Sequence, residues 1–269
     1  MKVVRLKILT TYNCTLRCTY CFEHRQDIGS DLTYDELVKG IEKAKPYLYN
    51  KMQIMFFGGE PLMNFEMCQK SCDILGQNYR YFLYTNGTFF NQKYIDFIKN
   101  NHIRLIVSFD GVGSGNDLRK FPNGQSCDKI ILKNIKKYID NDIIPMVDMC
   151  IHDTSIPTLF DSIKALSDIG VKKIEFRAAE DYITDLNAYE EQLKLITKFY
   201  IDRLGTEKAL IIDPPFESAY RIKDGDDHRW IHTAKDTCNL ELHPGGKLKF
   251  IPTVMTMKYK EYEKIGEVL

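Results

Sequence analysis

Segments typical of strands alternate with segments typical of helices along most of this chain, and this alternation restricts the possible folds more than any other feature. Six strand–helix units with short connections predict an α/β fold, a parallel sheet with helices outside it. The alternation alone allows either a partly closed barrel or an open doubly wound sheet. The expected strands are residues 3–9, 53–57, 81–84, 104–109, 144–151 and 173–176, and the expected helices are residues 34–47, 65–75, 92–99, 128–139, 156–169 and 189–204.

The character of the sequence changes after residue 212. An Asp-Pro-Pro sequence leads into a polar stretch, and a predicted hairpin follows, with strands 240–243 and 247–250 around a Pro-Gly-Gly turn. We therefore expect one large domain, residues 1–212, and a short C-terminal extension, residues 213–269.

Charge and hydropathy exclude several classes of protein. Lys plus Arg and Asp plus Glu balance at 37 each, which does not favour a nucleic-acid binder. The N-terminal segment is too short and too charged for the core of a signal peptide. No apolar stretch approaches the roughly 18 residues of a membrane span, so we expect a cytoplasmic protein. Eight cysteines in a reducing compartment point to metal binding or catalysis more than to disulfides.

Three cysteines, Cys14, Cys18 and Cys21, follow the first expected strand within one loop. Three thiolates can hold three irons of a 4Fe-4S cluster and leave the fourth iron open for a ligand. The alternative is zinc, because His24 lies three residues beyond Cys21 and could complete a Cys3His site. Structural zinc sites usually combine two separated ligand pairs, which favours the cluster.

Four motifs at the ends of consecutive expected strands resemble the radical S-adenosylmethionine (SAM) superfamily. The resemblance is to its SPASM/twitch branch, which includes sulfatase-maturing enzymes and peptide maturases. The motifs are Cys-x3-Cys-x-Tyr-Cys with Tyr20 as its aromatic residue, Gly58-Gly59-Glu60, Thr85-Asn86-Gly87 and Ser108-Phe109-Asp110-Gly111. The resemblance implies a partial (β/α)6 radical SAM barrel with a small C-terminal hairpin extension, one 4Fe-4S cluster held by the three cysteines, and bound SAM.

The resemblance also implies roles for the motif residues. Gly58 and Gly59 let the backbone approach a ligand closely, and Glu60 can accept a hydrogen bond from the ammonium group of SAM. Thr85 and Asn86 could bind a ribose. For each motif the alternative is structural: a tight Gly-Gly turn, or an Asn-Gly turn.

A second group of residues could bind the other parts of SAM. Ser108 can bind the methionine carboxylate, and Arg119 can pair with it in bidentate fashion. Tyr20 offers a ring face to the adenine. The alternatives are a solvated loop charge for Arg119 and simple packing for Tyr20, while Asp110 more plausibly fixes the turn at Gly111.

The other five cysteines divide into two groups. Cys68, Cys72, Cys127 and Cys150 are expected to be small structural residues. Cys238 opens a stretch that resembles the start of the SPASM or twitch extension, but no cysteine follows it. The resemblance therefore implies an extension without an auxiliary cluster. Cys238 is either a buried packing residue or a hydrogen-atom donor to a substrate radical.

Three functional hypotheses follow from these residues. The first is a radical SAM enzyme that cleaves SAM to a 5′-deoxyadenosyl radical, abstracts a substrate hydrogen and modifies a peptide or protein. The second keeps this chemistry and makes the substrate a small metabolite. The third is a non-catalytic zinc or iron–sulfur binding module. Either enzyme would need an electron donor such as a flavodoxin or a ferredoxin.

Overall fold

A curved sheet of nine strands organises the protein. The structure, a computed structural model, describes residues 2–21, 30–178, 183–213 and 237–252. Within these residues the strand order is β7-β6-β5-β4-β3-β2-β1-β8-β9. All neighbours are parallel except β8 and β9. The strands are β1 (Lys2–Thr11), β2 (Gln53–Gly58), β3 (Arg80–Thr85), β4 (Arg104–Ser108), β5 (Met146–Ile151), β6 (Lys173–Ala178), β7 (Ile211–Asp213), β8 (Thr237–Leu242) and β9 (Leu248–Pro252).

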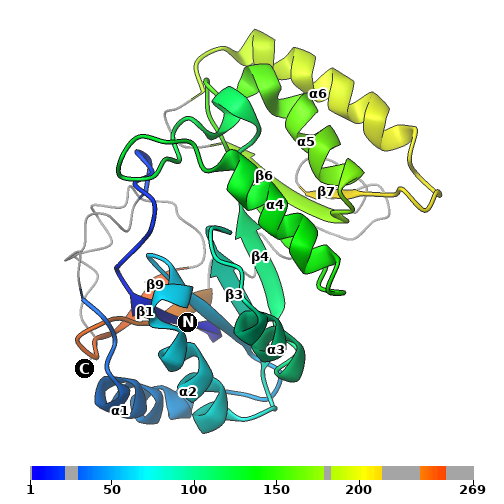
Figure 1. The fold of residues 1–269 in the computed structure, drawn as a ribbon. Helices are drawn as coiled ribbons and strands as arrows, with labels where there is room; N and C mark the ends of the chain where they lie inside the picture. Colours follow the sequence, from blue (N-terminus) through cyan, green and yellow to red (C-terminus); the bar gives the residue numbers. More distant parts are fainter. Residues whose placement is uncertain (1, 22–29, 179–182, 214–236, 253–269) are drawn as a thin grey trace.

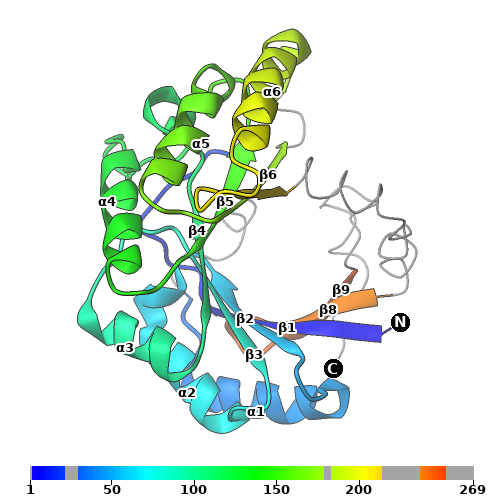
Figure 2. The ribbon, with the colours of Figure 1, turned by 90° about the vertical axis from the view of Figure 1, so that its right-hand side faces the viewer.

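Within the described residues, six α-helices cover one face of this sheet. Figure 2 shows them along its convex side, so that the sheet and its helices form part of a barrel. The two outermost strands, β7 and β9, do not pair with each other within the described residues, and the barrel is therefore partial. The helices are α1 (Tyr34–Ala44), α2 (Phe65–Leu75), α3 (Gln92–Asn100), α4 (Asp128–Ile139), α5 (Leu159–Asp168) and α6 (Leu186–Ile201).

Apolar and polar side chains alternate along the strands, so the sheet has an apolar face under the helices and a polar concave face. Leu6 of β1 and Leu242 of β8 are completely buried under the helices, where a Cβ on Gly40 of α1 would lie 2.4 Å from a Leu242 methyl carbon. The concave face of the same two strands carries Lys7 and Glu241 instead, joined by an ion pair of 2.8 Å. Successive side chains of a strand point to opposite faces, so one sequence supplies both surfaces.

The C-terminal hairpin belongs to the same sheet. Its first strand, β8, pairs with β1 in parallel, with Val3 opposite Cys238 and Ile8 opposite Leu242. In Figure 1 the hairpin, coloured orange, lies beside the blue first strand. Since β2 pairs with the other edge of β1, the first strand of the chain lies inside the sheet.

The expected α/β fold with six strand–helix units and a C-terminal hairpin is confirmed. The capping box at the start of α1 is also present, with both the Thr33 and the Glu36 side chains bonded to backbone. Two expected helices prove shorter because a 3-10 turn that contains a proline replaces one end: Lys45–Tyr47 after α1 and Ile156–Thr158 before α5. No helix among the described residues is long and apolar enough to cross a membrane.

Candidate active site at the carboxyl ends of the strands

The four motif segments meet at one edge of the sheet. The strands β1 to β4 are neighbours and parallel, so their carboxyl ends lie side by side. The cysteine loop follows β1, Gly59 and Glu60 follow β2, Asn86 follows β3, and Ser108 is the last residue of β4. In α/β folds this edge is where ligands bind.

The cysteine loop is held in place by backbone hydrogen bonds to the loop after β4. Arg17 N donates to the Lys120 carbonyl at 2.8 Å, and Thr19 N donates to the Leu118 carbonyl at 3.0 Å. The cysteines of this loop are therefore fixed against the segment that carries Arg119.

The three thiols lie close enough to interact electrostatically. Burial, assisted by the charges of Cys14 and Cys21, raises the pKa of Cys18 to about 12, and burial also raises the pKa of Cys14. Three neighbouring thiols in one half-buried loop are the donor set that an iron–sulfur cluster needs. Cluster binding would release their protons.

No three His, Cys, Asp or Glu side chains within the described residues come together as ligands of one metal ion. His24, the fourth ligand of the zinc alternative, lies outside those residues.

Gly58 and Gly59 bring β2 very close to the start of the cysteine loop. A Cβ on Gly58 would lie 2.3 Å from the Thr11 carbonyl oxygen, and one on Gly59 would lie 2.3 Å from that of Asn13. Two hydrogen bonds of 2.8 Å accompany this approach, from Gly59 N to Thr11 O and from Glu60 N to Asn13 O. Only glycine allows this contact between two backbones.

Glu60 is fully buried, and its carboxylate binds groups of the chain itself. It accepts hydrogen bonds from the Thr85 hydroxyl (2.9 Å), from Asn86 N (2.7 Å) and from Leu62 N (3.2 Å). Burial raises the pKa of Glu60 to about 7 against these three donors. The Glu60 carboxylate thereby fixes the segment after β3.

Asn86 extends this network to the cysteine loop. Its side-chain nitrogen lies 2.9 Å from the Thr15 hydroxyl and 3.5 Å from Sγ of Cys14, while its oxygen accepts from Thr88. Both Thr85 and Asn86 are nearly buried. The structure thus places these two residues under the cysteine loop.

A second buried network links the cysteine loop to β4. The Tyr20 hydroxyl donates to Asp110 and accepts from Nη1 of Arg119 at 3.0 Å. Arg119 also lies 4.0 Å from Asp110, and its Nε has no hydrogen-bond partner. The alternative of a solvated loop charge does not hold for Arg119, which is 6% exposed. Asp110 does more than form a turn, because it holds Tyr20 and also accepts from Cys150 N at 3.0 Å.

Sequence reasoning missed two histidines of this edge. His152 follows β5 and is buried beside the same network, with its ring centre 6.1 Å from that of Tyr20 and Nε2 3.9 Å from Asp110. Burial lowers the pKa of His152. His243 follows β8, and its Nδ1 lies 2.6 Å from the Tyr12 hydroxyl. Neither histidine belongs to a sequence motif with characteristic spacing. The feature that could have identified them is their position directly after a parallel strand.

The remaining cysteines occupy different places. Cys68, Cys72 and Cys127 are buried in the core. Cys150 is half-buried on the concave face of β5. Cys238 is buried opposite Val3, near the end of β1 that is far from the cysteine loop, which favours the packing interpretation.

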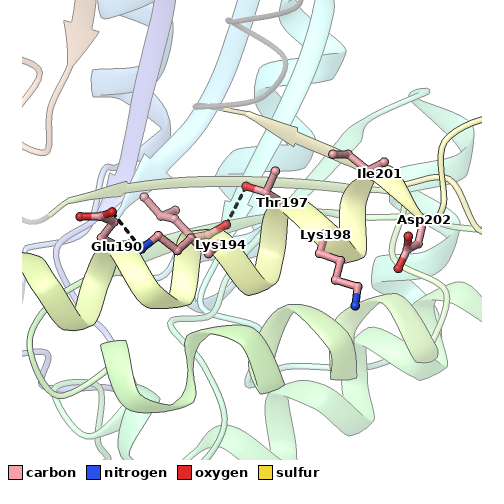
Figure 3. A pocket seen from close by; sticks show the side chains of 7 residues that line it. Glu190, Lys194, Thr197, Lys198, Ile201 and Asp202 are labelled. Carbon is pink, nitrogen blue, oxygen red and sulfur yellow. Dashed lines mark hydrogen bonds and ion pairs between the residues drawn. The ribbon is translucent and has the colours of Figure 1, made fainter.

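A surface hollow on α6 is separate from this site. It has a volume of about 460 Å³, and Figure 3 shows its side chains along one flank of the helix. None of the motif residues lines it. The lining residues are Glu190, Leu193, Lys194, Thr197, Lys198, Ile201 and Asp202.

Comparison with known proteins identifies the family. The model of the radical SAM superfamily matches residues 8–152, more than half of the chain. An uncharacterized protein of Methanocaldococcus jannaschii is 30% identical over 210 residues, 74% of this chain and 71% of its own length. The radical SAM cyclopropyl synthase TigE of Paramaledivibacter caminithermalis is 24% identical over 161 residues, 52% of this chain and 34% of its own length.

A solved structure agrees in fold. Native anSMEcpe with bound AdoMet superimposes with a TM-score of 0.78 at 18% identity, over 96% of this chain and 79% of that chain. Together with the family match, the partial barrel and the cysteine loop after its first strand lead to one conclusion. The chain belongs to the radical SAM superfamily and is an enzyme of that family.

Proposed function

We propose that this enzyme cleaves SAM reductively and uses the resulting radical to abstract a hydrogen atom from a peptide or protein substrate. The observation that carries the proposal is the meeting of the cysteine loop with three further motif segments at one edge of the sheet. An electron donor such as a flavodoxin or a ferredoxin would reduce the cluster. The superfamily to which the chain belongs implies both a 4Fe-4S cluster and SAM.

The proposed cluster ligands are Cys14, Cys18 and Cys21. When bound, the cluster and SAM supply the radical chemistry, and the chain supplies their position. The thiols fit this group because they lie within electrostatic reach of one another in a loop fixed by backbone hydrogen bonds on two sides.

The proposed SAM contacts come from the residues around that loop. Ser108 and Arg119 would bind the methionine carboxylate, and the unpaired Nε of Arg119 is a donor available for it. Tyr20 would lie against the adenine. Glu60, Thr85 and Asn86 would serve the site mainly by holding the loop, since their polar groups already bind one another and Thr15.

The concave face of the sheet is the proposed substrate surface. Its charged side chains are partly accessible and paired across neighbouring strands, as in Lys7–Glu241 at 2.8 Å and Arg177–Asp148 at 2.9 Å. Such a polar surface suits the amide groups of a peptide. The related fold of anSMEcpe has been solved with bound AdoMet and a Cp18Cys peptide, which supports the peptide class.

Metal analysis tests the cluster. Protein reconstituted without oxygen should bind about four irons per chain, as for one cluster, and should form 5′-deoxyadenosine from SAM when dithionite is added. Replacement of the three loop cysteines by Ala should abolish both. Stoichiometric zinc with no capacity for iron would overturn the proposal, as would a triple variant that retains its cluster.

Isotope transfer tests the substrate class. Extracts of the source organism grown in heavy water would be incubated with the reduced enzyme and unlabelled SAM. If a peptide is the substrate, deuterium should appear in 5′-deoxyadenosine with the peptide fraction, and exhaustive proteolysis of that fraction should abolish the transfer. Transfer from a protease-resistant small-molecule fraction would instead establish the metabolite alternative.

A further inference from the structure

One buried hydrogen bond joins the C-terminal hairpin to the cysteine loop. The Tyr12 hydroxyl lies 2.6 Å from Nδ1 of His243, and both residues are more than nine-tenths buried. Tyr12 is two residues before Cys14, and His243 directly follows β8. The bond therefore connects the proposed cluster loop to a strand 231 residues away in the sequence.

A carboxylate on β8 lies close to the ring of His243. Oε2 of Glu241 lies 3.5 Å from Nε2 of His243, and Oε1 accepts from the Lys7 ammonium at 2.8 Å. Burial opposes ionisation of Glu241, but the contacts with His243 and Lys7 lower its pKa to about 2. A negative charge on that side favours the proton on Nε2 and leaves Nδ1 to accept from Tyr12.

The cysteine loop is thus held from both strands that flank β1. On the β2 side, Gly59 N and Glu60 N donate to the carbonyls of Thr11 and Asn13. On the β8 side, the side chain of His243 holds Tyr12. The start of the loop is fixed between these two contacts.

We propose that His243 is a positioning residue for the proposed cluster site. Through Tyr12, the hairpin β8–β9 keeps Cys14 where it can bind iron. The inference rests on the proposed role of Cys14, Cys18 and Cys21 as cluster ligands. The hairpin resembles an auxiliary-cluster region in sequence. Its proposed function here is to position the cysteine loop, which requires no second cluster.

The experiment compares variants at the two ends of this bond. Tyr12→Phe and His243→Leu each remove it, their double variant removes both partners, and His243→Asn keeps a side-chain acceptor near the position of Nδ1. Tyr81→Phe is the matched control, because it deletes another 2.6 Å phenol hydrogen bond, to the Gly76 carbonyl, on the same sheet.

Two measurements are made on each variant. The first is the rate at which reconstituted protein loses iron to a chelator. The second, on metal-free protein, is the rate of amide hydrogen exchange in residues 12–21. Loss of one net hydrogen bond corresponds to a factor of about 2 to 12, so each single variant should accelerate both rates severalfold.

The pattern across variants decides the outcome. The double variant should be no faster than the faster single variant, because all three remove the same hydrogen bond, and His243→Asn should restore most of the wild-type rate. Equal acceleration by Tyr81→Phe, or unchanged rates in both single variants, would overturn the proposal. A protein that binds no iron would refute the cluster assignment, whereas hydrogen exchange would still measure the hold of His243 on the loop.

Discussion

At the scale of single residues, buried polar groups determine how this site is held. Glu60 shows the effect most clearly, since a carboxylate with no exposure to water binds two backbone N–H groups and the Thr85 hydroxyl. A buried carboxylate is stable only when such donors surround it. Its replacement should therefore disturb the cysteine loop through Asn86.

Glu60 should make stability depend on pH. Its pKa is about 7 in the folded protein against 4.5 ordinarily, so the folded state keeps a proton that the unfolded state has lost. The free energy of unfolding should therefore fall as pH rises from about 4.5 to about 7. Glu60→Gln cannot titrate. The stability advantage of the wild type over this variant should shrink by on the order of 2 kcal/mol across that range.

Urea unfolding of the metal-free protein at pH 5 and pH 8 measures this difference. Other buried groups titrate equally in both proteins and cancel in the comparison. A difference that is the same at both pH values would show that Glu60 does not titrate as described.

Arg119→Gln should weaken SAM binding about 10- to 150-fold, the factor for a lost charge-assisted hydrogen bond. The single variant also leaves Asp110 buried without its nearby cation. The double variant with Asp110→Asn should recover stability but not affinity. The measurement is the equilibrium binding of SAM to reconstituted protein. The control is Lys120→Gln, which removes the charge of the neighbouring residue, whose side chain is 38% exposed. Unchanged affinity in Arg119→Gln would limit its role to compensating Asp110.

Sequence could predict which residues gather at this edge but not what each one binds. The motif spacing located Tyr20, Glu60 and Arg119. The Tyr20–Asp110–Arg119 network depends on the path of the loop after β4, which no local pattern encodes. His152 and His243 were not predicted, because a single histidine forms no motif whose spacing could be recognised in the sequence.

At the scale of elements, the close approach of β2 to the cysteine loop is the most sensitive contact. Gly59→Ala would place a Cβ 2.3 Å from the Asn13 carbonyl oxygen and 2.6 Å from that of Tyr12. Since these are backbone atoms, the loop must move, at a cost of about 1–3 kcal/mol. Iron bound per chain after reconstitution should fall severalfold.

A glycine elsewhere provides the control for that substitution. Gly76 ends α2 with φ of 75°, and a Cβ there would meet nothing within 4 Å. Gly76→Ala should cost about 1–3 kcal/mol from backbone strain alone and leave iron binding intact. Equal loss of iron in both variants would show that general destabilisation, not contact with the loop, is responsible.

Cys238→Ala should behave as a packing change. The thiol is buried at the start of β8 opposite Val3, while the cysteine loop follows the other end of β1. We expect a stability loss on the order of 1 kcal/mol, with the same rate of 5′-deoxyadenosine formation and the same product. A variant that cleaves SAM but gives a quenched or cross-linked product would instead identify Cys238 as a hydrogen-atom donor.

Some element boundaries were predicted correctly from the sequence and others were not. The bounds of α2 and α4 agree with the prediction, as the periodicity of their apolar residues is unbroken. The helix α6 begins three residues before its expected start because Asp185 caps it, accepting from Ala188 N. The short strand β7 was missed, since three residues cannot show an alternation.

At the scale of the whole molecule, the alternation of strands and helices predicted a parallel α/β sheet, and the motif resemblance was needed to predict a partial barrel. Neither showed where the hairpin joins the sheet. Parallel pairing of β8 with β1 is decided by residues at opposite ends of the chain. The sequence of residues 240–243 predicts a strand but does not indicate which other strand it pairs with. Only the assembled fold shows that His243 and Tyr12 meet.

The interior place of β1 has a consequence for synthesis on the ribosome. Of the described strands, β1 is made before the others, yet one of its edges stays open until β8 has emerged, more than 200 residues later. At about 5–20 residues per second, that edge is exposed for roughly 10 to 50 seconds, and an unpaired edge strand is a template for aggregation. Nascent chains arrested before residue 237 should therefore bind chaperones and precipitate when released, whereas chains that extend past residue 252 should remain in solution.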